Sequence, residues 1–236
     1  MTYNNYFELR NIDKNYYDDY KAPNYILDII KKNKIKKILD YGCGTGQLVK
    51  ALKNKKIDIV GMDISDDAIE IGKKNGVDII KIGELEYEKK KYKNEFDLII
   101  ISHVLEHQKK EMMDTFLSHL KYMIKNNKFL LAIVPNAQSL TGSYWRYEDF
   151  THETLFTSGS LRYVLIKNGF SNIKFLDIYA TSKLNVIFKL IRYLTIKIYG
   201  LVHKIFLKIT GNSYHNFSKD IFTYEIKCLC QKKEIK

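Results

Sequence analysis

Apolar segments of strand length alternate with amphipathic segments along most of this chain. Short apolar runs predict buried strands, whereas segments in which apolar residues recur every three or four positions predict helices. The predicted strands cover residues 36–42, 58–65, 77–84, the start of 96–107, 128–136, 172–180 and 221–230. Because these strands are apolar almost throughout, both faces of the sheet must be covered, which indicates an α/β fold with a largely parallel sheet.

Helical periodicity occurs between the strands, in residues 46–56, 66–76, 109–127 and 157–170. The apolar face of the third helix is expected to carry Met112, Phe116, Leu120 and Met123. Thr157 or Ser158 can cap the start of the last helix, and Gly169 suits its end. Two segments, 1–35 and 181–219, stand outside this alternation.

Within the second outlying segment, residues 183–209 predict an amphipathic helix. At about 100° per residue, one stripe is apolar and consists of Ile187, Ile191, Leu194, Ile198, Leu201, Ile205 and Ile209. Another side carries only basic charge, from Lys183, Lys189, Arg192, Lys197, Lys204 and Lys208. This pattern is typical of a helix at an anionic interface, either the inner face of a membrane or a lipid-linked acceptor. A helical cap or dimer interface that buries its own stripe is the alternative, and Gly200 is a position where the helix could divide.

Composition narrows the class of protein. The 236 residues are 45% hydrophobic, enough for one α/β domain with additions. A formal charge of +12 suits an anionic partner, although a solvated lysine-rich surface explains it equally well. The three cysteines indicate a reducing compartment, and Cys228 and Cys230 are expected in the core. With neither a signal peptide nor a run of about 18 apolar residues, we expect a cytoplasmic protein.

Three glycines and an acid mark the turn after the first predicted strand. Asp40 is followed by Gly42, Gly44 and Gly46, between a strand and a helix, where a bare backbone lets a ligand approach closely. The spacing differs from the G-x-G-x-x-G of dinucleotide enzymes, and the Lys and Ser/Thr of a phosphate-binding loop are missing. A carboxylate at Asp40 would repel a pyrophosphate and attract an ammonium group.

"LDYGCGTG" resembles motif I of class I S-adenosylmethionine-dependent methyltransferases, E/D-x-G-x-G-x-G. "FDLIIISHVLEH", "FLLAIVPN" and "LRYVLIKNGF" are similar to later segments of that family, especially of quinone-type O-methyltransferases and enzymes of surface-glycan pathways. The resemblance covers residues 36–180 and resumes at 220–230. It implies a Rossmann-like, seven-stranded, mostly parallel sheet with an antiparallel last strand and helices on both faces. It also implies an N-terminal helical lid (1–35) and a helical insertion (181–219) before the last strand.

The resemblance also implies S-adenosyl-L-methionine as the cofactor and a core, 36–180 with 220–236, that binds it. Asp40 and the glycines would hold its methionine part, and Asp63, at the end of the second strand, would accept hydrogen bonds from the ribose. The residues expected at the cofactor are Asp40, Gly42, Cys43, Gly44, Gly46, Gln47, Asp63, Ile64, Gly83, Glu84, Leu85, Ser102 and His103. In the lid, Tyr16, Tyr17 and Tyr20 are candidates to line the acceptor site, with simple packing as the alternative.

A hydroxyl acceptor needs a general base, for which histidine is suited. His103 and His107 follow the fourth strand, at the sheet edge where ligands bind in open α/β folds. Their H-x-x-E-H pattern also occurs in zinc peptidases, but there both histidines lie on one helix. Some quinone methyltransferases hold a divalent metal here. Glu106 and His107 match that motif whereas His103 replaces an acid, so no metal is assigned.

The loop after the fifth strand is long enough to be functional. Within it, His152 is a candidate base, Arg146 a candidate ligand for an anionic group and Trp145 a candidate pocket wall; Asn136 and Tyr144 are further acceptor candidates. A packing role for His152 and a surface role for Arg146 are the alternatives.

These observations favour a methyltransferase acting on a small molecule, by O-methylation of a sugar or phosphorylated precursor of a surface polysaccharide. The alternatives are an RNA-modifying or RNA-binding protein, suggested by the charge, a methyltransferase of a lipid-linked or quinone acceptor at the membrane, and a binding protein without turnover. The sequence indicates neither the acceptor nor whether the protein is a monomer or a homodimer.

Overall fold

The computed structural model describes residues 20–83, 91–181, 184–213 and 220–233. Within them, seven strands form one sheet in the order β3-β2-β1-β4-β5-β7-β6. The strands are β1 (Lys37–Tyr41), β2 (Asp58–Asp63), β3 (Ile79–Lys81), β4 (Phe96–Ser102), β5 (Ile124–Pro135), β6 (Phe170–Leu176) and β7 (Glu225–Lys232). β1 to β5 pair in parallel, and β7 runs antiparallel between β5 and β6. The Rossmann-like sheet predicted from the sequence is confirmed.

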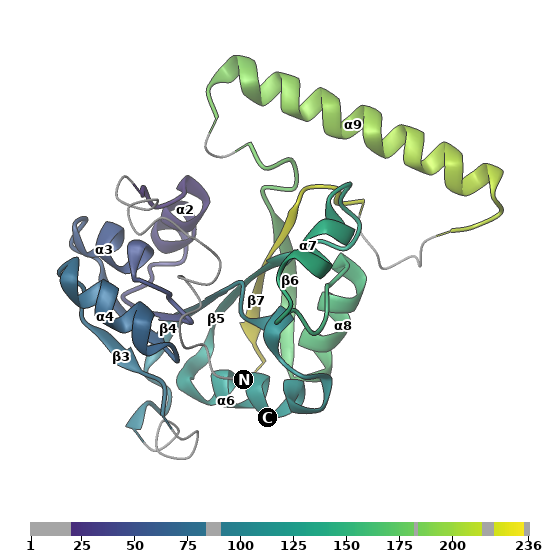
Figure 1. Cartoon of the computed structure of the whole chain (residues 1–236). Helices are drawn as coiled ribbons and strands as arrows, with labels where there is room; N and C mark the ends of the chain where they lie inside the picture. Colours follow the sequence, from purple (N-terminus) through teal and green to yellow (C-terminus); the bar gives the residue numbers. More distant parts are fainter. Residues whose placement is uncertain (1–19, 84–90, 182–183, 214–219, 234–236) are drawn as a thin grey trace.

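Helices cover both faces of the sheet (Figure 1). The α-helices are α2 (Asn24–Lys32), α3 (Gln47–Lys53), α4 (Asp66–Lys74), α6 (Met113–Met123), α7 (Gly142–Glu148), α8 (Ser158–Lys167) and α9 (Val186–Ile209), and two 3-10 turns are η1 (Leu105–His107) and η2 (Lys110–Met112). Alternate residues of β4 point to opposite faces. Leu98 and Ile100 pack in the cluster with α2 and α3, whereas Ile99 and Ile101 pack with α6 and α8.

Tertiary pairing overrides the local pattern at several element ends. β5 begins at Ile124, inside the segment predicted as a helix, because Ile124 is fully buried and pairs with Phe96 of β4. At the other end of the predicted helix, Met112 belongs to η2 and precedes α6 instead of lying on its buried face, and Met112 is 48% exposed. β6 ends at Leu176, four residues before the predicted end, where Asp177 adopts a left-handed φ of 42°.

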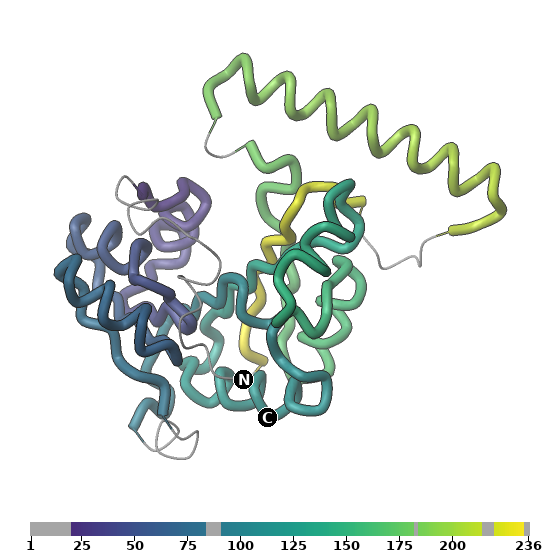
Figure 2. The backbone as a smooth tube through the Cα atoms, in the orientation of Figure 1, coloured from purple at the N-terminus to yellow at the C-terminus, as the bar shows by residue number. Residues whose placement is uncertain are grey.

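The predicted helix 183–209 forms, but two expectations about it are wrong. α9 runs unbroken through Gly200, because this glycine allows close packing on Phe222 and keeps helical geometry. The apolar stripe of α9 is not buried against the described core, so α9 is not a cap that covers its own stripe. In Figures 1 and 2 the helix stands apart from the layered core.

The N-terminal segment is described only from residue 20. α2 packs on the sheet through Ile26 and Ile29. Tyr16 and Tyr17 lie outside the described residues, as do Glu84 and Leu85 of the predicted cofactor site. The helical lid therefore stays a prediction. The cysteines Cys228 and Cys230 are buried in β7, as expected for core residues.

The turn after β1 requires glycine for two different reasons. Gly42 has φ +79°, and a Cβ placed there would lie 2.4 Å from Cγ2 of Val104. Gly44 has φ +56°, but a Cβ there would meet nothing within 4 Å. The left-handed region disfavours side chains at both positions. Gly42 is thus fixed by conformation and packing, whereas Gly44 is fixed by conformation and borders open space.

We predict that Gly42→Ala destabilises the fold by at least about 2 kcal/mol, because backbone strain adds to the clash with Val104. Gly44→Ala should cost about 1–2 kcal/mol, since only the strain applies. Urea unfolding of both variants measures the difference. In a Val104→Ala background the two glycine substitutions should lower the free energy of unfolding by equal amounts. If the difference between them stays the same in this background, the explanation is contradicted.

Candidate functional site

A cavity of about 440 Å³ opens at the carboxyl ends of β1, β2 and β4. Ligands of open α/β sheets bind at this edge. The cavity lies where the sequence places the cofactor. Its described lining consists of Tyr41, Gly42, Gly44, Asp63, Ile64, Ser65, Ala68, Ile82, Gly83, His103, Val104, His107, Gln108, Met112 and Phe116.

The carboxylate of Asp63 accepts hydrogen bonds from two turns that line this cavity. Its Oδ2 accepts a hydrogen bond from the amide of Gly44 at 2.7 Å, and its Oδ1 accepts one from the amide of Ser65 at 2.8 Å. Burial raises the pKa of Asp63, although the hydrogen bonds from these amides oppose the shift. A carboxylate has about four acceptor positions, so Asp63 can hold the glycine turn and accept further hydrogen bonds from a ligand.

Asp40 lies at the end of β1 and is buried, behind the residues that line the cavity. Burial raises its pKa to about 7, and the nearby charge of Asp63 adds to this shift. Two carboxylates in one buried region favour a cation between or beside them. Tyr20 lies in the same region: burial raises its pKa to about 12, and the charges of Asp40 and Glu225 contribute.

The structure brings some of the predicted cofactor residues to the cavity and leaves others behind it. Gly42, Gly44, Asp63, Ile64, Gly83 and His103 line the cavity, whereas Asp40, Cys43, Gly46, Gln47 and Ser102 do not. The sequence reasoning missed Met112 and Phe116, which it assigned to the face of a core helix. The turn at η2 points Met112 toward the cavity, a change of direction that helical periodicity does not reveal.

His103 is held between two carboxylates. Its Nδ1 lies 3.2 Å from Oε1 of Glu106, and its Nε2 lies 3.4 Å from Oε2 of Glu225. Burial alone would lower the pKa of His103, but these two contacts outweigh it and raise the pKa to about 10. The imidazole is therefore a cation at neutral pH. The backbone of His103 has a left-handed φ of 56°, which turns the chain out of β4.

His107 has the opposite electrostatics. Burial lowers its pKa below the usual value, and the neighbouring His152 lowers it further, so the ring is neutral at pH 7. Its Nδ1 lies 2.8 Å from Oγ1 of Thr151, and that hydroxyl donates to Oδ1 of Asp149 at 2.6 Å. Since the hydroxyl proton points to Asp149, Nδ1 of His107 is the donor to Thr151. This tautomer puts the basic lone pair of His107 on Nε2.

His152 anchors the loop that follows β5. Its Nδ1 donates to the carbonyl of Trp145 at 2.6 Å, and an Arg146 guanidinium nitrogen donates to the carbonyl of His152. The ring is buried and packs against His107, with 4.7 Å between ring centroids. His152 is therefore placed behind His107 and does not line the cavity. The predicted loop also contains the short helix α7, which carries Tyr144, Trp145 and Arg146.

Glu106, His107 and His152 place one ligand atom each within 4.8 Å of one another. Glu106 is fully buried, and neither of its carboxylate oxygens has a well-aligned hydrogen bond within the described part of the chain. Two imidazoles and a carboxylate are a donor set that suits a transition metal. Oε1 of Glu106 also lies 3.2 Å from Nδ1 of His103, so this carboxylate has a partner within the protein.

Two acceptor candidates lie in different surroundings. Asn136 is fully buried, and its Nδ2 donates to the carbonyls of Ile221 and Thr223, each at 2.8 Å. Both amide protons are thus used, and Asn136 fastens the loop to the segment before β7. Tyr144 is 54% exposed and packs edge-on against Trp145.

A buried charge network extends from His103 along β7, and the sequence reasoning missed it. Lys227 lies 3.1 Å from both Glu225 and Asp177. Burial would raise the pKa of Glu225, but His103 and Lys227 hold it at about 2. A glutamate and a lysine two residues apart in the predicted apolar last strand were the available signal, because buried charges are rare without partners.

Comparisons with known proteins agree with this geometry. A family model described as a methyltransferase domain matches residues 15–174, more than half of the chain. A search of curated proteins finds no match. A SAM-dependent methyltransferase of Archaeoglobus fulgidus is 20% identical, with TM-score 0.62 over 96% of this chain and 98% of that one.

Two further structures share the fold. Phosphoethanolamine N-methyltransferase 2 of Haemonchus contortus, in complex with S-adenosyl-L-methionine, is 16% identical with TM-score 0.64 over 99% of this chain and 60% of that one. A possible histamine N-methyltransferase of Thermotoga maritima is 16% identical with TM-score 0.55 over 98% and 94%. The glycine turn, the acid at the end of β2 and the family match lead to one conclusion: the chain belongs to the methyltransferase domain family.

Proposed function

We propose that this protein transfers a methyl group from S-adenosyl-L-methionine to an oxygen atom of a small-molecule acceptor. The observation that carries the proposal is the shared cavity, where Asp63 and Gly44 meet a neutral, oriented histidine, His107. Asp63 would accept the ribose hydroxyls, and Asp40 would attract the ammonium group. Bound S-adenosyl-L-methionine supplies an activated methyl group, so the protein's task is alignment and removal of the acceptor proton.

His107 is the base we propose for that proton. Its lowered pKa keeps the ring neutral at pH 7, and the Asp149–Thr151 pair directs the basic lone pair to Nε2. The positive charge that forms on the ring would be stabilised by Glu106 and Asp149. His103 is a cation under the same conditions and is therefore suited to positioning. His152, fixed by Trp145, would support the ring of His107.

For the acceptor we propose a sugar or a phosphorylated precursor of a surface polysaccharide. The resemblance to surface-glycan methyltransferases supports this class. Arg146 uses one guanidinium nitrogen for the carbonyl of His152, and a guanidinium carries five N–H donors, which suit a phosphate. An acceptor attached to a lipid is a second candidate, because α9 exposes an apolar stripe flanked by basic residues.

Cofactor binding should depend on pH through Asp40. Only the ionised carboxylate attracts an ammonium group, so the affinity for S-adenosylhomocysteine should fall about tenfold for each pH unit below about 7. Calorimetry across this range measures the slope. Asp40→Asn should lower the affinity at least about tenfold at pH above 7 and remove the slope. Asp58→Asn, at the opposite end of β2, is the matched control; an unchanged slope in Asp40→Asn would refute the assignment.

Methyl transfer should require His107. We expect tritiated S-adenosyl-L-methionine to label nucleotide sugars or sugar phosphates in a panel that also contains quinols and RNA. On the labelled acceptor, His107→Ala should lower kcat about 10²–10⁴-fold and leave donor binding intact. Thr151→Val removes the hydroxyl that fixes the tautomer of His107 and should therefore lower kcat. Thr151→Ser keeps a hydroxyl at this position and should restore kcat. Labelling of RNA alone, or full kcat in His107→Ala, would contradict the proposal.

The histidine mechanism also predicts that chelation has no effect. Dialysis against EDTA should leave kcat unchanged, because the proposed mechanism gives Glu106 a partner within the protein, His103, and needs no metal ion. The assay is methyl transfer before and after dialysis. Loss of activity on dialysis that Mn²⁺ or Zn²⁺ restores would instead show that the cluster of Glu106, His107 and His152 binds a metal ion. In that case the metal should not restore activity to Glu106→Gln.

A further inference from the structure

Helix α9 contacts the core through one narrow face. Gly200 is buried, and a Cβ placed on it would lie 3.0 Å from the ring of Phe222. The rings of Tyr199 and His203 pack edge-on against the same Phe222, with centroids at 5.3 and 5.4 Å. These three positions lie on one side of the helix, which is therefore the docking face toward the core.

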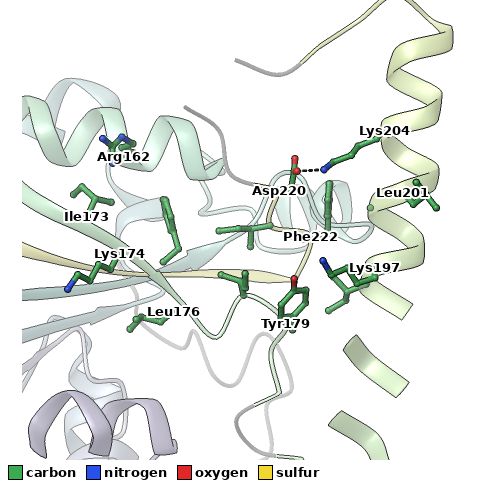
Figure 3. A pocket seen from close by; sticks show the side chains of 15 residues that line it. Arg162, Ile173, Lys174, Leu176, Tyr179, Lys197, Leu201, Lys204, Asp220 and Phe222 are labelled. Carbon is green, nitrogen blue, oxygen red and sulfur yellow. Dashed lines mark ion pairs between the residues drawn. The ribbon is translucent and has the colours of Figure 1, made fainter. Parts of the chain in front are cut away.

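Polar contacts fix the orientation of the helix. Arg192 donates to the carbonyl of Ala180 at 2.7 Å, and Lys204 forms an ion pair with Asp220. Between α9 and the edge strand β6 lies a cavity of about 1030 Å³, so the helix is held at a few points and does not lie flat on the sheet. Figure 3 shows the Lys204–Asp220 pair at this cavity, with Phe222 beside the helix.

The apolar stripe faces the opposite way. Its seven members are between 48% and 79% exposed, and they are Ile187, Ile191, Leu194, Ile198, Leu201, Ile205 and Ile209. At 3.6 residues per turn, the middle of this stripe lies half a turn from the docking face. Val186, Phe188, Val202 and Phe206 extend the exposed apolar surface. A contiguous apolar surface of this kind on a soluble domain marks an interaction site.

The charges beside the apolar stripe of α9 indicate what kind of partner it binds. α9 contains no acidic residue, and Lys197, Lys204 and Lys208 share the helix side next to Leu201. Lys204 already pairs with Asp220, whereas Lys197 and Lys208 have no acidic residue of α9 beside them. Pairing with the stripe of a second copy would bring these two lysines beside an equally basic flank. An anionic lipid surface offers acyl chains to the stripe and phosphates to the lysines. None of the helices in the described part of the chain has the length and apolar character needed to cross a bilayer.

We propose that α9 binds the surface of an anionic membrane, with its apolar stripe in the interface and its Gly200 face carrying the methyltransferase core. The inference does not depend on methyl transfer, because it rests on the orientation and the charges of the helix. It explains why the docking face of α9 is small, whereas the larger apolar face is turned away from the protein. Bound in this way, the enzyme would meet acceptors at the membrane surface.

Vesicle sedimentation of the full chain tests the proposal. We expect the protein to pellet with phosphatidylcholine vesicles that contain phosphatidylglycerol, to pellet weakly with phosphatidylcholine alone, and to dissociate as salt is raised. Ile191→Glu with Ile198→Glu should weaken binding at least about tenfold. Lys197→Gln with Lys208→Gln, two lysines on the helix side next to Leu201, should weaken it about fivefold per lysine.

The control is Tyr163→Glu with Ile166→Glu, two exposed residues of α8 that give the same change in net charge. It should bind vesicles like the wild type. Binding of S-adenosylhomocysteine by every variant reports that the core is folded. Failure of the wild type to pellet with anionic vesicles overturns the proposal. So does a wild-type dimer that the Ile191/Ile198 variant converts to a monomer while vesicle binding stays unchanged.

Discussion

The hydrogen bonds from the Gly44 and Ser65 amides to the Asp63 carboxylate, at 2.7 and 2.8 Å, hold the site together. They join the turn after β1 to the turn after β2, two segments that adjacent parallel strands bring to one edge of the sheet. The glycine turn can take its left-handed conformation only without side chains, and the carboxylate then secures it. A rigid, open part of the cavity lining results, and the rest of the candidate site is built around it.

Ion pairs fix His103, which lines another part of the cavity. His103 leaves β4 as a cation between Glu106 and Glu225, and the chain of opposite charges continues through Lys227 to Asp177. Each buried charge has an opposite neighbour, which offsets the cost of burial. His107, four residues after His103, lies outside this series of ion pairs and stays neutral. Two histidines that follow the same strand thus acquire opposite protonation states from their surroundings.

Much of the fold could be predicted from the sequence, because apolar strands and amphipathic helices carry clear periodicity. Asp63, Gly42 and Gly44 line the cavity as expected, because their positions relative to the strand ends could be read from the sequence. The start of β5 was missed, since the pairing of Ile124 with Phe96 is a long-range contact. The charge network of Glu225 and Lys227 was missed because their other partners, His103 and Asp177, lie far away in the sequence. The direction of the α9 stripe depends on Phe222, which no helical pattern indicates.

The proposed activity requires that the cavity beside Asp63 binds a sulfur-containing adenosine cofactor. Titration calorimetry of the purified, folded chain with S-adenosylhomocysteine and, separately, with NAD tests this most directly. The account predicts a one-site heat of association with S-adenosylhomocysteine and none with NAD. Heat from NAD alone, with no response to S-adenosylhomocysteine or S-adenosyl-L-methionine, would contradict it.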